Sequence, residues 1–141
     1  MPRFVILTHD WPKLHWDFLV EAGSVLRAWR LLSEPCAGID IVAEPNFDHR
    51  LLYLDYEGPV SGNRGTVRRW DAGIFEWEQE GSASIVIRLE GRRLQGRAML
   101  KRITGDRWEF GGASVVREEC EVDPRANRSQ QQEPEDPKQT A

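Results

Sequence analysis

The chain has 141 residues and a formal net charge of −4 at pH 7, and 40% of its residues are hydrophobic, including six Trp. This length allows one domain and excludes a second full core, because independent domains usually take roughly 100–200 residues. The bulky apolar side chains exclude wholesale disorder, and no apolar run approaches the roughly 20 residues that a membrane-spanning helix requires.

The chain begins with a short apolar segment, Phe4–Leu7. This segment is too short for the core of a signal peptide, so we expect a cytoplasmic protein. Similar short segments, each bounded by Gly, Pro, Asn or Asp, recur along the chain and are typical of β-strands. We expect strands at Phe4–Leu7, Trp16–Glu21, Val25–Trp29, Arg50–Tyr53, Gly65–Trp70, Ser84–Leu89, Leu94–Leu100 and Trp108–Phe110.

The spacing of these segments predicts the fold class. Many short strands at regular intervals favour an all-β fold, here a small closed or nearly closed β-barrel of about eight short strands. We place this barrel domain at residues 1–122. No stretch has a sustained helical period, and Ile39–Glu44 is expected to form a single helical turn at most.

Residues 123–141 differ in composition from the rest of the chain. They lack large apolar side chains and are rich in Pro and Gln, so they cannot bury enough surface to offset their ordering entropy. We expect a disordered polar tail there. The two cysteines, Cys36 and Cys120, lie far apart without a CxxC pair, which indicates neither a zinc site nor a disulfide scaffold.

Two of the three histidines lie in the segment between the first two expected strands. His15 and Asp17 are two residues apart on a strand, so both side chains leave the same face, while Trp16 and Phe18 face the core. A loop at Pro12 allows His9 to fold back beside His15. Two imidazoles and a carboxylate form a three-ligand set that suits manganese, zinc or iron. The alternative is a pair of surface histidines beside a charged loop.

The third histidine lies near a tyrosine. On a strand, His49 and Tyr53 share a face and therefore line one pocket. An imidazole and a phenol both bind phosphate oxygens by hydrogen bonds. The alternative is that His49 caps a turn and Tyr53 packs in the core.

A basic segment runs from Arg88 to Arg107, with seven basic and two acidic residues in an otherwise acidic chain. On its central strand, Leu94, Ala98 and Leu100 occupy one face and the basic residues the other. The candidate nucleic-acid-binding residues are Arg93, Arg97 and Lys101, with Arg64 and Arg68 as a second source of positive charge. The alternative is a solvated barrel exterior in which these residues pair with Glu.

An ordered series of motifs spans residues 3–117. It consists of His9-Asp10, Leu14–Phe18, Trp29, Pro35, Asp48-His49, Tyr53, Glu57-Gly58, Gly65–Val67, Trp70-Asp71, Gly73, Leu89, Gly91, Leu94, Gly96, Leu100 and Arg102. This series resembles the 3′-phosphoesterase domain of bacterial DNA ligase D.

The resemblance implies a closed β-barrel that uses a divalent metal, typically manganese, to trim nucleic-acid 3′ ends. Such a domain removes a terminal ribonucleoside and then the remaining 3′-phosphate. Carried over by position, His9, His15 and Asp17 match the metal ligands. His49 and Tyr53 match residues that contact the phosphate. These five residues are the expected catalytic site.

The chain departs from the family pattern at three positions. Leu19, Ile41 and Ser33 stand where the family carries basic residues, and no apolar side chain replaces the bidentate bond of an arginine to phosphate. Arg30, beside Trp29, is a candidate for the missing phosphate donor, although the sequence alone does not place it at the site.

We therefore expect a stand-alone enzyme, a metal-dependent phosphoesterase that trims nucleic-acid 3′ ends in DNA repair. The expected partners are a DNA 3′ end, including one with a terminal ribonucleotide, and a separate DNA ligase, and the chain is expected to be monomeric. One alternative is a non-catalytic module of the same fold that binds DNA ends or a repair partner. Another is a phosphoesterase for a small phosphorylated metabolite.

Overall fold

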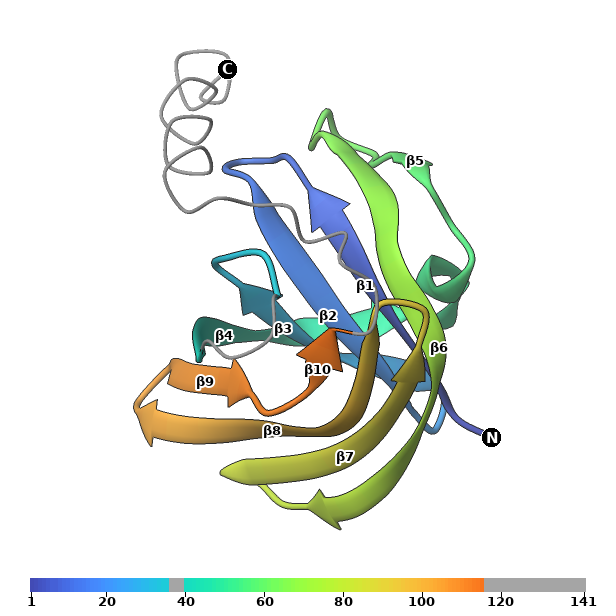
Figure 1. The fold of residues 1–141 in the computed structure, drawn as a ribbon. Coiled ribbons are helices and arrows are strands. Elements are labelled where there is room, and N and C mark those ends of the chain that lie inside the picture. Colours follow the sequence, from blue (N-terminus) through green and yellow to red (C-terminus); the bar gives the residue numbers. More distant parts are fainter. Residues whose placement is uncertain (36–39, 116–141) are drawn as a thin grey trace.

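Eight antiparallel strands close into a barrel in the computed structural model, which describes residues 1–35 and 40–115 (Figure 1). Neighbouring strands follow the order β1-β2-β3-β4-β9-β8-β7-β6, and pairing of β6 with β1 closes the ring. Their bounds are Arg3–His9, His15–Ala22, Val25–Leu31 and Ile41–Arg50 for β1 to β4, then Thr66–Glu80, Ser84–Gly91, Leu94–Thr104 and Arg107–Gly111 for β6 to β9. The predicted closed barrel of about eight strands is confirmed.

Three short elements accompany the barrel. Strand β5 (Gly58–Pro59) pairs with β6, and strand β10 (Ser114–Val115) pairs with β8. The 3-10 helix η1 (Leu51–Leu54) follows β4 directly. Within the described residues there is no helix with the length and apolar character of a membrane span.

Two local predictions were wrong. The expected strand at Arg50–Tyr53 is largely η1, and the expected helical turn at Ile39–Glu44 falls mostly in β4. Strand β4 pairs with β3 on one side and β9 on the other, so distant partners stabilise an extended conformation that its own sequence does not show. The predicted boundary at residue 122, the predicted tail and both cysteines lie outside the described residues.

The barrel interior contains one large apolar cluster. Strand β2 contributes Trp16 and Phe18 to it, and β8 contributes Leu94 and Leu100, all of them buried as expected. Aromatic rings from several strands meet there, including Phe18 and Phe110 with centroids 5.2 Å apart. Side chains therefore fill the barrel interior, as is usual for barrels of about eight strands.

A second apolar cluster lies on the outer face of β1–β3. It consists of Val5, Leu7, Leu19, Leu26, Ala28, Leu54 and Val67. Side chains from η1 and the chain that follows it pack over this cluster, including Leu51, Tyr53, Tyr56 and Val60. These three strands thus bury apolar side chains on both faces, and a covered layer forms outside the barrel.

Asp71 connects β6 to the β7–β8 turn. The residue is 2% exposed, and its carboxylate accepts backbone N–H bonds from Arg92 and Leu94 at 2.8 and 2.9 Å. Two more such bonds come from Ala72 and Arg93. A Cβ at Gly91 would overlap this carboxylate, which explains the glycine at that position. One buried carboxylate therefore accepts the hydrogen bonds of three successive backbone N–H groups in this turn.

Candidate functional site

His9, His15 and Asp17 converge on the outer face of the barrel. His9 ends β1 and His15 begins β2, and the two residues are direct partners across the strands, with ring centroids 4.8 Å apart. The Asp17 carboxylate reaches both rings, with Oδ2 at 3.2 Å from His9 Nδ1 and Oδ1 at 3.2 Å from His15 Nε2. The predicted ligand atoms all lie within 4.8 Å of one another.

Backbone carbonyls fix which nitrogen of each ring carries a proton. His9 Nε2 lies 2.9 Å from the Arg64 carbonyl oxygen, and His15 Nδ1 lies 2.8 Å from the Lys13 carbonyl oxygen. A carbonyl oxygen only accepts, so these two nitrogens donate. In the neutral imidazoles, the lone pairs of His9 Nδ1 and His15 Nε2 then face the Asp17 carboxylate.

This arrangement fits a cation. His15 Nε2 is buried and, among the described residues, has no hydrogen-bond partner. Three electron-rich atoms thus point toward one another, and a positive charge between them would relieve their repulsion. Two nitrogens and a carboxylate, with the rings oriented by carbonyl groups, suit a divalent transition metal with open positions.

The pKa shifts have the same electrostatic origin. Burial lowers the pKa of His9, but the Asp17 carboxylate and the Arg64 carbonyl together raise it above its ordinary value. Burial raises the pKa of Asp17, but the interactions with His15 and His9, in the form in which each ring carries a second proton and donates it to the carboxylate, outweigh this effect and hold the pKa well below its usual range. Asp17 is therefore a carboxylate at neutral pH, as a metal ligand must be.

A loop contact positions His9 relative to the β5–β6 connection. Asp10 Oδ1 accepts a 2.8 Å hydrogen bond from the Thr66 N–H. Gly65 beside it has a φ of 80°, and a side chain there would overlap Asp10 and Trp11. These two segments thus pack closely enough for the Arg64 carbonyl to reach His9.

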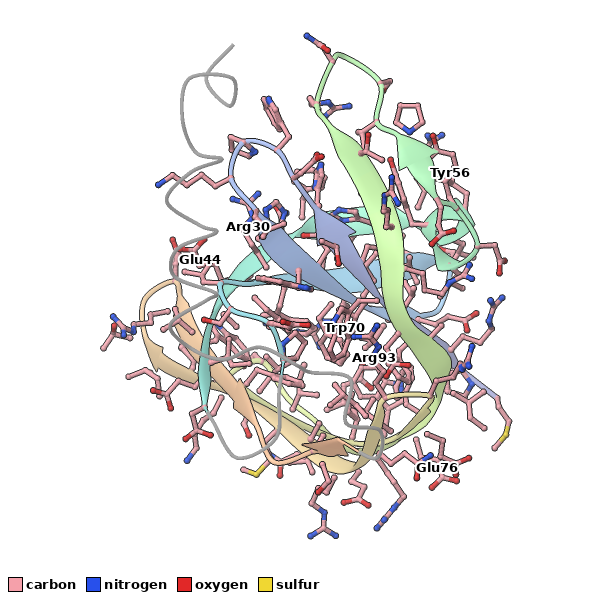
Figure 2. All side chains as sticks on the ribbon, turned by 45° about the horizontal axis from the view of Figure 1, so that its top comes forward. Arg30, Glu44, Tyr56, Trp70, Glu76 and Arg93 are labelled. Carbon is pink, nitrogen blue, oxygen red and sulfur yellow. The ribbon has the colours of Figure 1, made fainter. Side chains whose placement is uncertain are left out.

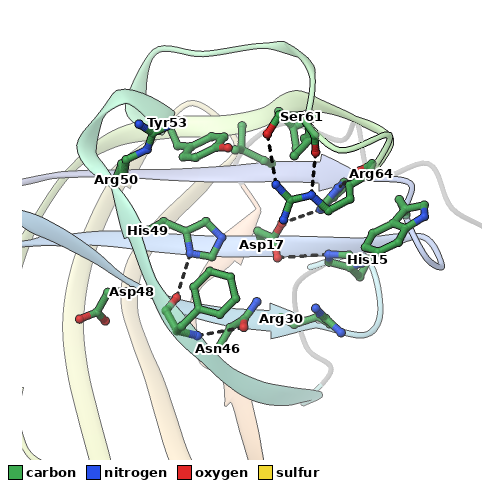
Figure 3. Close-up of a pocket in the computed structure, with 16 residues that line it drawn as sticks. His15, Asp17, Arg30, Asn46, Asp48, His49, Arg50, Tyr53, Ser61 and Arg64 are labelled. Atoms are coloured by element: carbon green, nitrogen blue, oxygen red, sulfur yellow. Dashed lines mark hydrogen bonds and ion pairs between the residues drawn. The ribbon is translucent and has the colours of Figure 1, made fainter.

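The three residues form one wall of a pocket of about 300 Å³. Figure 3 shows His49 on the opposite side from His15, with Tyr53 and Arg64 above the pocket and Arg30 below it. The lining residues are Leu7, His9, Trp11, His15, Asp17, Arg30, Asn46, Phe47, Asp48, His49, Arg50, Tyr53, Val60, Ser61, Arg64 and Val67.

His49 and Tyr53 lie together in this pocket, but not as alternate residues of one strand. His49 belongs to β4 and Tyr53 to η1, so the prediction of a shared strand face was wrong. The chain turns at Arg50 and brings the two rings to 5.7 Å between centroids. His49 Nδ1 donates to the Phe47 carbonyl at 2.9 Å, which leaves Nε2 for a ligand.

Most predicted nucleic-acid-binding residues lie away from this pocket. Of the five, Arg64 alone lines it. Arg97 pairs with Glu78 at 2.8 Å, and Arg93 lies over the Trp70 ring at 4.5 Å (Figure 2). Arg68 and Lys101 are exposed. The basic face of β8 agrees with its predicted alternation, and its contact with nucleic acid stays a prediction.

Two of the residues that stand where the family carries basic side chains are buried among apolar side chains. Leu19 is fully buried in the outer cluster, and Ile41 is buried inside the barrel. Arg30, in contrast, lines the pocket on β3, directly opposite Asp17 in the strand pairing. A two-residue turn at Gly23 fixes the register of the hairpin and pairs Asp17 with Arg30. This register was the signal in the sequence that could have placed Arg30 at the site.

Comparison with known proteins identifies the family of this chain. Residues 7–102 match the family described as the DNA Ligase D 3′-phosphoesterase domain. The multifunctional non-homologous end joining DNA repair protein LigD of Mycobacterium tuberculosis is 31% identical over 114 residues, which is 74% of this chain and 15% of that protein. The LigD protein of Pseudomonas aeruginosa is 31% identical over 112 residues, or 71% of this chain and 13% of that protein. The chain thus spans a small part of these relatives, and it belongs to the DNA ligase D 3′-phosphoesterase domain family.

Proposed function

We propose that the chain is a divalent-metal-dependent phosphoesterase that trims nucleic-acid 3′ ends during DNA repair, with manganese as its metal. The observation that supports this most is the convergence of His9, His15 and Asp17 in a pocket that also contains His49 and Tyr53. His9 Nδ1, His15 Nε2 and an oxygen of Asp17 would hold the metal. A cation bound there would polarise a phosphoryl oxygen as a Lewis acid.

The proposed chemistry has two hydrolytic steps. In the first, water adds to the phosphodiester, the bond to the terminal ribonucleoside breaks, and a 3′-phosphate remains. In the second, water adds to that phosphate, the bond to the 3′ oxygen breaks, and inorganic phosphate leaves a 3′-hydroxyl. Each leaving oxygen receives a proton, so charge and atoms balance.

His49 and Tyr53 are the proposed phosphate donors. When His49 carries a second proton, its Nε2–H donates to a phosphoryl oxygen, while Nδ1–H stays on the Phe47 carbonyl. The Tyr53 ring packs edge-on to His49, and its hydroxyl is the second donor. Donors held in place before the reaction stabilise the charge that develops on the phosphate.

The biological setting belongs to the same proposal. The mycobacterial relative is a multifunctional non-homologous end joining DNA repair protein, and we propose a DNA ligase as the partner of this chain in the same repair. The proposed substrates of this chain are the ends of broken chromosomal DNA. Its proposed location is therefore the cytoplasm, where bacterial chromosomes lie. Arg64, at the pocket rim, is the proposed first contact with the nucleic-acid backbone.

His49→Ala is expected to slow manganese-dependent release of phosphate from a DNA primer with a 3′-phosphate by about 10- to 100-fold, because one charge-assisted bond is lost. The measurement is single-turnover cleavage of a labelled primer. Arg107→Ala removes an exposed side chain outside the pocket and should cleave at the native rate.

Other outcomes favour the other functions. If the native chain binds the primer but releases nothing with manganese, the protein is a non-catalytic end-binding module. If it cleaves a small phosphorylated metabolite and neither binds nor cleaves the primer, it is a metabolite phosphoesterase. A native rate for His49→Ala would remove His49 from the proposed mechanism.

A further inference from the structure

Three arginines line the pocket, and their surroundings differ. The Arg64 guanidinium is held by Ser61, whose carbonyl oxygen and hydroxyl accept hydrogen bonds at 2.7 and 3.2 Å. Arg50 is exposed at the rim. Arg30 is only partly exposed, and its Nε is buried without a hydrogen-bond partner among the described residues.

The position of Arg30 is set by the barrel. It lies on β3, and its partners in the strand pairing are Asp17 on β2 and Glu44 on β4. Figure 2 shows Arg30 and Glu44 near each other, but within the described part of the chain no hydrogen bond or ion pair holds Arg30 to an acidic residue. Arg30 therefore lines the pocket, opposite Asp17 in the strand pairing, and no carboxylate of the described residues holds its guanidinium.

A buried guanidinium donor without an acceptor is costly to keep. An unsatisfied buried donor typically destabilises a fold, and more so when it is charged. The planar guanidinium matches the oxygens of a phosphate group in a two-pronged hydrogen bond. An anionic ligand in the pocket would satisfy Arg30, whereas the neighbouring position on β2 is Leu19, which offers no donor.

We infer that Arg30 binds the non-bridging oxygens of the substrate phosphate, on the β3 side of the metal site. The inference rests on the proposed function in taking a phosphate ester as the ligand. It assigns the phosphate-binding guanidinium to β3 in this chain, where β2 has an apolar residue. The phosphate could belong to a terminal monoester or to an internal diester, and two probes separate these sources.

The test is calorimetric titration of the full chain with thymidine 3′-phosphate before manganese is added, so that the probe is not hydrolysed during the measurement. The dinucleotide TpT supplies a diester, and thymidine supplies no phosphate. Arg30→Ala should weaken binding of thymidine 3′-phosphate by about 10- to 100-fold, as expected for one charge-assisted interaction, while thymidine is unaffected. Manganese affinity without nucleotide should be unchanged or tighter, because a nearby positive charge has gone.

Two further variants give this test its controls. Arg30→Lys keeps the charge but loses the planar fork, so its affinity should lie between those of the native chain and Arg30→Ala. Arg107→Ala makes the same change in net charge outside the pocket and should bind as the native chain does. If Arg30→Ala does not fold, the comparison of Arg30→Lys with the native chain decides.

The inference is overturned if native and Arg30 variants bind both thymidine 3′-phosphate and TpT equally, or if the native chain binds neither. A loss of manganese affinity in Arg30→Ala would instead make Arg30 a support for Asp17, which also overturns it. A loss restricted to TpT would assign Arg30 to the diester alone. These binding results do not depend on cleavage, so a native chain that binds through Arg30 but cleaves no primer refutes the proposed enzyme and not the phosphate contact.

Discussion

Asp17→Asn is expected to abolish manganese binding, with a loss of affinity of more than about 100-fold, because changes to residues that merely support metal ligands already cost 10- to 100-fold. Asp17 is the group that joins the two imidazoles, at 3.2 Å from each. The amide is nearly the same size, so the fold should persist. What is lost is the negative charge, and the amide NH₂ would donate to one imidazole lone pair.

The measurement is calorimetric titration with manganese, together with circular dichroism to show that the variant is folded. Asp106→Asn makes the same chemical change at an exposed position in the β8–β9 turn and should leave the titration unchanged. Manganese-dependent cleavage of the 3′-phosphate primer should disappear with metal binding. A native titration curve for Asp17→Asn would refute the ligand set.

Asp71→Ala is expected to lower the free energy of unfolding by about 3–5 kcal/mol, as for removal of one partner of a buried charged network. Asp71 is 2% exposed, and the loss of its carboxylate would leave the N–H groups of the β7–β8 turn without their acceptor. Asp71→Asn should cost less, because one amide oxygen still accepts, although its NH₂ group would face the Leu94 N–H.

Urea denaturation, followed by tryptophan fluorescence, measures this change. Asp106→Ala, at an exposed turn position, should change the free energy of unfolding by less than about 0.5 kcal/mol. Manganese affinity should remain native in folded Asp71→Asn, since Asp71 does not line the pocket. A loss of less than about 1 kcal/mol in Asp71→Ala would show that water replaces the carboxylate at this turn.

The sequence predicts the barrel well where alternation and turns are local. Trp16 and Phe18 face the interior because a strand places alternate residues on opposite faces, and a two-residue turn fixes the β2–β3 pairing. It fails at β4, whose conformation depends on β3 and β9, and at η1, whose apolar residues pack outward onto the barrel. Apolar residues alone do not distinguish a strand from a short helix on a covered surface.

The sequence predicts the residues of the candidate site better than it predicts the contacts that orient them. The spacing of His15 and Asp17 places both on one strand face, and the loop at Pro12 allows His9 to fold back beside them, as the structure shows. The Arg64 carbonyl that orients His9 has no signature in the sequence, because any residue supplies a carbonyl. The burial of Leu19 beneath a second apolar layer could not be predicted either, because the sequence around Leu19 does not show that other segments cover the outer face of the barrel.

The bond from His9 to the Arg64 carbonyl spans 55 positions of the chain. The ring orientation needed for metal binding therefore depends on the folded state of the connection between β5 and β6. By linkage, a ligand that binds the oriented His9 ring also stabilises the folded β5–β6 connection. The free energy by which ligand binding favours that connection equals the free energy by which the folded connection favours ligand binding. A bound cation would therefore stabilise the ordered conformation of that segment. A substitution that destabilises the segment would lower the affinity for the cation without changing any of its ligands.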